Sequence, residues 1–299
     1  MGGVCRQIWA KLSPAALLLA LALVAYLPLL PESQAPSEPV EELVRNTVAN
    51  ELKPETSYFM FRARKQASWG TQTRIYVQTG EATAGMVVAE NDRPLDAARR
   101  QAELDRLDYL AHNAAELRRK QKREKEDADR ITRIVRALPS AFLYQYDGLE
   151  QSHGAIGSPG DELVRLKFQP NPKYNPPTRV EQVLVGMQGI VLIDRSKHRI
   201  AKIDGTLYKD VSFGWGFFGH LDKGGKFQVD QGEVAGGQWA TTRMGLNFTG
   251  KILLFKNLVI DSNEVFSDFQ KVPDDLTFAD AVALLKKQEG TASPSTTKK

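Results

Sequence analysis

The stretch Leu163-Val164-Arg165-Leu166-Lys167-Phe168-Gln169 decides the fold class, because apolar and charged side chains alternate along it. Successive side chains of a β-strand point to opposite faces, so the alternation predicts a strand with one buried face. Antiparallel sheets commonly have one packed face and one solvated face. We therefore expect this stretch to lie in an antiparallel sheet that packs on one side.

Similar patterns recur on both sides of this stretch, separated by turns that contain glycine or charged residues. Near the N-terminal end, Phe59, Phe61 and Ala63 alternate with Arg62 and Arg64. Such a series of short strands and turns is typical of a strand meander. The predicted strands are 57–65, 73–79, 85–90, 143–147, 163–169, 190–193, 199–207, 226–234, 238–248, 251–260 and 262–271.

Helical patterns interrupt and flank these strands. Residues 39–53 and 278–287 show apolar residues at helical spacing, and Thr178 with Glu181 has the spacing of a capping box before a short amphipathic helix that ends near Gly189. The longest helical region is 95–138. Together with the strands, these helices predict an α+β fold.

Within 95–138, the run RRKQKREKED from Arg118 to Asp127 contains no apolar residue. No face of such a run can pack on a core, so we expect two amphipathic helices joined by a solvated segment, or one long arm that projects. Pairs such as Lys120 with Glu124 favour a solvated helix. The alternative is a contact arm for acidic lipid head groups or for a partner protein.

The N-terminal segment has the three parts of a secretory signal. Arg6 and Lys11 precede an uncharged apolar stretch, and small and polar residues follow at 32–35. The helix expected over 15–27 spans about 20 Å, less than the hydrocarbon core of a bilayer. We predict a signal peptide or N-terminal anchor over 1–35, a single domain over 36–288, and a disordered tail over 289–299. The body is expected to be exported, either periplasmic or anchored to the inner membrane facing the periplasm.

Composition and motifs exclude several classes of function. Cys5 is the only cysteine, which excludes a disulfide framework and a thiolate metal site. A net charge of +4 over 299 residues gives no electrostatic footprint for nucleic acid. The chain has no phosphate-binding loop, dinucleotide fingerprint or nucleophile elbow. The spacing of the four histidines predicts no compact metal site. We therefore predict no enzyme, no catalytic residue, no metal and no cofactor.

Four aromatic residues alternate with three glycines in the stretch Phe213-Gly214-Trp215-Gly216-Phe217-Phe218-Gly219. Aromatic rings on a flexible backbone can cover an apolar ligand or enter a membrane interface. Alternatively, the glycines let a strand bend while the rings fill the inner face of a curved sheet. The sequence leaves both interpretations open.

Three late segments carry a family resemblance: 199–205 (RIAKIDG), 250–256 (GKILLFK) and 265–269 (VFSDF). With the apparent export signal and the long antiparallel sheet, the chain resembles the outer-membrane lipoprotein-sorting and lipoprotein-carrier superfamily, and more narrowly a group of uncharacterised exported bacterial proteins near it. The resemblance implies a curved half-barrel whose concave, apolar face is closed by helices. The charged helical region departs from the compact carriers of that superfamily.

Two hypotheses of function follow. In the first, the half-barrel cavity binds a lipid or the acyl chain of a lipoprotein. In the second, the protein is a periplasmic sensor or scaffold that acts through contacts with an envelope protein. The candidate lipid-binding residues are apolar side chains expected on or near the inner face of the sheet: Phe59, Phe61, Phe168, Phe213, Trp215, Phe217, Trp239 and Leu246.

Overall fold

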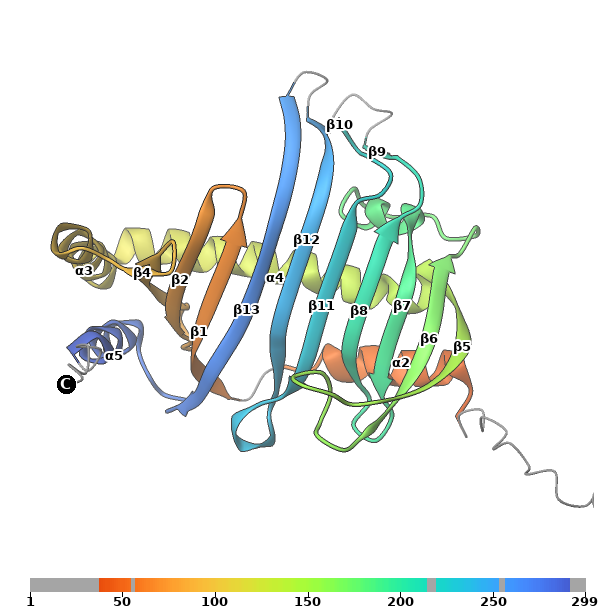
Figure 1. The fold of residues 1–299 in the computed structure, drawn as a ribbon, viewed down its shortest axis with the longest axis horizontal. Helices are drawn as coiled ribbons and strands as arrows, with labels where there is room; N and C mark the ends of the chain where they lie inside the picture. Colours follow the sequence, from red (N-terminus) through yellow and green to blue (C-terminus); the bar gives the residue numbers. More distant parts are fainter. Residues whose placement is uncertain (1–37, 55–56, 214–218, 253–255, 291–299) are drawn as a thin grey trace, which may run out of the picture. The chain divides into compact units, whose positions relative to one another are not determined.

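An open antiparallel sheet organises the residues that the computed structural model describes, which are 38–54, 57–213, 219–252 and 256–290 (Figure 1). The strands follow the order β4-β3-β2-β1-β13-β12-β11-β8-β7-β6-β5, and the β9–β10 hairpin is attached to β12. Because β4 and β5 lie at the two ends of this order, the sheet is not closed. The predicted α+β fold class with an open half-barrel sheet is confirmed. The predicted export signal over 1–35 lies outside the described residues, as does the tail predicted over 289–299 apart from Glu289 and Gly290, which end the last helix.

The strands match most of the predicted ranges. Their bounds are β1 (Tyr58–Ala67), β2 (Gly70–Val77), β3 (Ala84–Glu90), β4 (Arg93–Pro94), β5 (Phe142–Gln151), β6 (Glu162–Pro170), β7 (Met187–Asp194), β8 (Arg199–Leu207), β9 (Val211–Phe213), β10 (Gly219–Leu221), β11 (Lys226–Glu233), β12 (Trp239–Ile252) and β13 (Lys256–Val272).

The predicted separation of this region into strands 238–248, 251–260 and 262–271, with a turn at Gly250, is wrong. Gly250 lies within β12 and pairs with Leu258 of β13, and β13 continues without a break through residue 262. Strands predicted over 251–260 and 262–271 are thus parts of the long β12–β13 pair.

The helices are α2 (Val40–Glu51), α3 (Ala97–His112), α4 (Ala114–Ala141) and α5 (Phe278–Gly290). Short 3₁₀ helices lie at η2 (Glu181–Gly186) and η3 (Ala235–Gly237). The amphipathic helix predicted after Thr178 is therefore a single 3₁₀ segment followed at once by β7. The Thr178 hydroxyl donates to the Glu181 carboxylate at 2.7 Å.

The charged run lies inside one continuous helix, so of the two arrangements expected for it the solvated break at 118–127 is wrong, and the run belongs to one long helix as the alternative held. The break comes earlier, at Asn113, whose side-chain oxygen accepts from the backbone N–H groups of Ala115 and Glu116 and so caps α4. Ion pairs support the helix through the run, including the predicted pair of Lys120 with Glu124 at 2.7 Å. Packing at the two ends of the helix, rather than along its middle, holds it in place.

The two larger cores lie on opposite faces of the sheet, and a small third core of Leu163, Leu192 and Ala201 lies on the outer face. On one face, α2 and the last turn of α4 pack on β5 to β8, as the cluster of Leu43, Ala141, Leu166 and Val191 shows. The strand register places Phe61, Met244 and Phe266 on this same face. We call it the concave face.

The second core lies on the outer face, at the opposite end of the sheet. There α5 packs Phe278 and Leu285 against Met60, Val77 and Met86 of β1, β2 and β3. Met60 and Phe61 are neighbours on β1 and therefore point to opposite faces. The resemblance implied that helices close the concave face alone; α5 covers the outer face instead, and so leaves part of the concave face open.

The sheet is curved, and α4 crosses its concave side. Glu124 of α4 accepts a hydrogen bond from the N–H of Thr83, just before β3, and the helix ends at Ala141, just before β5. A flat sheet would separate β3 from β5 by nine strand spacings, or about 43 Å. The part of α4 between Glu124 and Ala141 spans only about 26 Å. The helix is therefore a chord across a bent sheet, as its course behind the strands in Figure 1 indicates.

Candidate functional site

An aromatic cleft of about 430 Å³ opens on the uncovered part of the concave face. One wall is formed by Phe59 and Phe61 of β1 with Phe266 and Phe269 of β13. The ring centroids of Phe61 and Phe269 are 5.4 Å apart and stacked, and Phe266 lies edge-on to Phe61 at 6.0 Å. Phe59 is buried at the floor, whereas the other three rings are half-buried and line the open space.

A bulge in β13 brings two of these rings to one face. Phe266 and Phe269 are three residues apart, so a regular strand would place them on opposite faces. Asp268 has a positive φ of 57°, and the pairing of β1 with β13 shifts by one residue at Met60/Arg62. Aspartate tolerates this left-handed conformation better than most residues. The bulge therefore turns Phe269 toward Phe61.

Trp239 and Met244 of β12 form the opposite wall. The indole N–H of Trp239 donates to the carbonyl oxygen of Ile200 at 3.2 Å and to the side-chain oxygen of Gln231 at 2.9 Å. The Arg199 guanidinium lies 5.9 Å from the Trp239 ring centroid. These contacts fix the ring, which packs on one side against Leu163, Leu192 and Ala201 and also lines the cleft.

The rim carries the end of α2. Glu51 accepts from the N–H of Ile200 at 2.8 Å and pairs with Arg199 at 3.2 Å. Burial raises the pKa of Glu51 above its ordinary value, while Arg199 and the Ile200 N–H act in the opposite direction. Lys53, by contrast, is exposed at the rim and has no ion-pair partner within the described part of the chain. One unpaired cation thus lies at the mouth of the cleft, whose aromatic wall faces a rim of polar residues.

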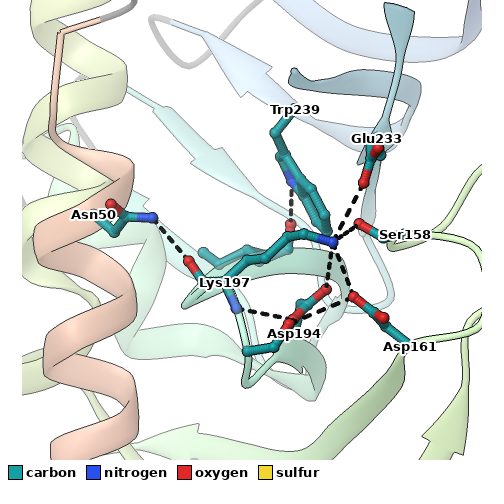
Figure 2. A network of polar contacts seen from close by, with 9 residues as sticks. Asn50, Ser158, Asp161, Asp194, Lys197, Glu233 and Trp239 are labelled. Atoms are coloured by element: carbon teal, nitrogen blue, oxygen red, sulfur yellow. Dashed lines mark hydrogen bonds and ion pairs between the residues drawn. The ribbon is translucent and has the colours of Figure 1, made fainter. Parts of the chain in front are cut away.

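A polar network beside the cleft fastens the β7–β8 hairpin (Figure 2). The Lys197 ammonium donates to Asp161 at 2.9 Å, to Glu233 at 3.3 Å and to the Ser158 hydroxyl. Asp194, which is fully buried, accepts from the backbone N–H of Lys197 at 3.0 Å. The bond from Lys197 holds the pKa of Asp161 below its ordinary value. Because Asn50 of α2 donates to the carbonyl oxygen of Lys197 at 3.0 Å, the network also positions α2 at the rim.

The structure brings together three of the eight predicted site residues, Phe59, Phe61 and Trp239. Phe168 is buried 4.7 Å from Phe142 beneath α2 and α4, in the closed half of the concave face. Leu246 and Phe213 are half-buried against the same core. The remaining two, Trp215 and Phe217, lie outside the described residues.

Among the cleft residues that the sequence analysis did not name are three large apolar ones, Met244, Phe266 and Phe269. Phe266 and Phe269 were visible only as part of the segment 265–269 that supports the family resemblance. The pattern of apolar and polar residues along β13 gave no sign that Phe266 and Phe269 lie on the same face of the sheet.

A larger hollow, of about 580 Å³, lies on the outer face over β8, β11, β12 and β13. Its lining is mostly polar and includes Asp204, Lys226, Arg243 and Asn263. Because most of its lining is polar or charged, with Phe227 and Leu246 the only large apolar residues among those that line it, this hollow is less suited to the predicted class of ligand than the aromatic cleft.

The described residues contain no group of three or more His, Cys, Asp or Glu side chains that could hold a metal ion. Among the helices built from them, none has the length and apolar character needed to cross a bilayer.

Comparison with known proteins gives a distant structural likeness. No protein-family model matches the sequence, and no curated protein matches it either. A solved domain named for outer membrane lipoprotein sorting, from Vibrio parahaemolyticus, is 9% identical; the match covers 82% of this chain and 97% of that chain, with a TM-score of 0.31. A DUF1329 family protein from Desulfovibrio piger ATCC 29098 is 8% identical, with 79% and 94% covered and a TM-score of 0.28. The structural search thus returns the group named by the sequence resemblance, at a distance too great to carry an argument about function.

Proposed function

We propose that this protein binds the acyl chain of a lipid or lipoprotein in the aromatic cleft of the concave face, without catalysis. The observation that carries the proposal is the convergence of Phe61, Phe266 and Phe269 on an open space faced by Trp239 and Met244. Apolar side chains that stay half-exposed in this way form a surface that a ligand can cover.

The dimensions and chemistry of the cleft suit such a ligand. A volume of about 430 Å³ lies within the range of small-molecule sites. Each buried methylene contributes about 0.8 kcal/mol, so eight to ten methylenes supply roughly 6 to 8 kcal/mol before the entropy of binding is subtracted. Lys53 at the rim provides a cation for a polar head group. The cleft accommodates part of a long chain, and the rest would extend along the open concave face.

Binding of an environment-sensitive fatty-acid probe tests the proposal. We expect the delipidated protein to bind the probe stoichiometrically at micromolar concentration and to release it to added phospholipid. Phe266→Asp places a carboxylate in the apolar wall, and we expect it to weaken binding at least tenfold because desolvating the charge is costly.

The matched control is Val265→Asp, one residue away on β13. Val265 is 41% exposed and points to the outer face, so the same substitution there leaves the cleft unchanged. Equal weakening by both variants would show that the probe binds elsewhere. The absence of probe binding to the wild-type protein would refute the acyl-chain proposal.

The proposed ligand would be met outside the cytoplasm, where the N-terminal sequence is expected to deliver the chain. Arg6, Lys11 and the uncharged stretch after them support export in a bacterium. A phosphatase reporter that is active only after export, fused after Gln288, is expected to be active. A reporter that works only in the cytoplasm should be silent at the same position. The reverse result would place the body in the cytoplasm and contradict the proposal of an envelope protein.

A further inference from the structure

Helix α4 concentrates the net charge of the chain. Its 28 residues include nine basic and five acidic side chains, a net charge of +4. The whole chain also has a formal net charge of +4, so the remaining residues sum to zero. The net positive charge therefore resides on α4, the helix that crosses the concave side of the sheet.

Five cations of this helix have no ion-pair partner among the described residues; four of them point away from the sheet together, and the fifth, Arg123, projects from another side of the helix. Arg118, Lys122, Arg133 and Arg136 are exposed, and none has an ion-pair partner within the described ranges. At 3.6 residues per turn they fall within about 60° of one another around the helix axis. The half-buried positions Leu117, Glu124 and Val135 lie on the far side of the helix. We call these four residues the basic ridge.

Four other cations of α4, Arg119, Lys120, Lys125 and Arg130, are paired with carboxylates within the helix. Arg119 pairs with Glu116, and Lys125 pairs with Asp129 at 3.0 Å. The basic ridge differs from them because its four charges are left to solvent. It extends over about 27 Å along the helix.

We propose that the basic ridge docks the protein on an anionic lipid bilayer. Lipid head groups present a flat, adaptable layer of negative charge and need no shape complementarity, whereas a protein partner usually needs an apolar centre to its interface. Between Arg118 and Arg136 the outward side of α4 offers no such centre: Ile134 is half-buried, and Ile131 projects from another side of the helix. The ridge is positively charged and follows a straight helix, so it can lie along the flat, negatively charged surface of a membrane.

Docking in this way would turn the concave side toward the bilayer, because α4 lies on that side. The inference rests on the charges of α4 and stands whether or not the aromatic cleft binds an acyl chain.

Sedimentation with lipid vesicles tests the proposal on the exported form of the protein. We expect binding to phosphatidylglycerol vesicles at low salt, weakening as salt screens the charges, and little binding to phosphatidylcholine vesicles. Near an anionic surface each Lys or Arg contributes a factor of about five, so replacing all four ridge residues by glutamine should lower the partition constant by roughly several hundredfold. Glutamine maintains helix propensity, which circular dichroism can verify.

The matched control removes the same charge from the outer face, by changing Arg62, Lys202, Lys226 and Arg243 to glutamine. We expect its partition constant to stay within about threefold of wild type, because these residues face away from α4. Equal loss in both variants would mean that net charge alone drives binding and would overturn the assignment to the ridge. Absence of vesicle binding, with capture of polyglutamate instead, would indicate an acidic polypeptide partner and overturn the lipid assignment. Phe266→Asp should bind vesicles normally, which separates this test from that of the cleft.

Discussion

Replacing Phe278 by alanine is expected to lower the free energy of unfolding by about 3 to 5 kcal/mol. The side chain is 1% exposed and lies at the start of α5, in the outer-face core with Met60 and Val77. Its removal leaves a cavity between the helix and the sheet, because the backbone N–H of Phe278, held by Glu81 at 2.6 Å, limits how far the helix can settle. Urea unfolding followed by tryptophan fluorescence measures the loss.

The control for this variant is Tyr109→Ala on α3, where the ring is 57% exposed. We expect a change within about 0.5 kcal/mol there. A loss below about 1 kcal/mol for Phe278→Ala would show that α5 does not contribute a core to the outer face.

Gly189→Ala should be nearly as damaging, although it adds a single methyl group. A Cβ at Gly189 of β7 would lie 1.9 Å from the carbonyl oxygen of Asp204 and 2.9 Å from the Cα of Gly205, both in the backbone of β8. Backbone atoms in a paired strand cannot rotate away as a side chain can, so β7 and β8 must separate. We expect about 3 kcal/mol of lost stability, or failure to accumulate as soluble protein.

Gly245→Ala provides the comparison within the same sheet. There the added Cβ would meet only the Cβ of Gln228, at 3.7 Å, which is ordinary van der Waals contact. Because alanine restricts the unfolded chain more than glycine does, we expect no loss and a gain of up to about 1 kcal/mol. Thermal unfolding of Gly189→Ala and Gly245→Ala distinguishes a steric clash at Gly189 from a general destabilisation by alanine in this sheet. Equal stability of the two variants would contradict the close approach of the β7 and β8 backbones at Gly189.

The sheet could be predicted from the sequence because its signal is local. Alternation in β6 and β1 located those strands to within a few residues, and Phe59 and Phe61 were placed together on one face for the same reason. The position of Phe168 could not be found this way. Alternation identifies the buried side of a strand, but only the distant helices α2 and α4 decide which buried side chains are covered and which line an opening.

The continuity of α4 could not be predicted by searching for an apolar stripe. The charged run has no apolar stripe because no apolar side chain packs along it, yet Lys, Arg, Glu and Gln are good helix formers and pairs such as Lys120 with Glu124 stabilise it. Similarly, the second half of the cleft depends on the bulge at Asp268, a change of register that composition does not reveal. In both cases the missing information is the tertiary context.

Because α4 spans the bent sheet in a straight line, the length of this helix and the number of strands together determine how deep the concave side is. Each strand between β3 and β5 adds about 4.8 Å to the arc, and about three residues of helix would be needed to lengthen the chord equally. A relative that gained a strand without those residues would bend more tightly and deepen the space above β1, β13 and β12. One that gained a turn of helix without a strand would flatten the sheet and make that space shallower. The length of α4, rather than the identity of the cleft residues, would then set how long a ligand the concave side could enclose.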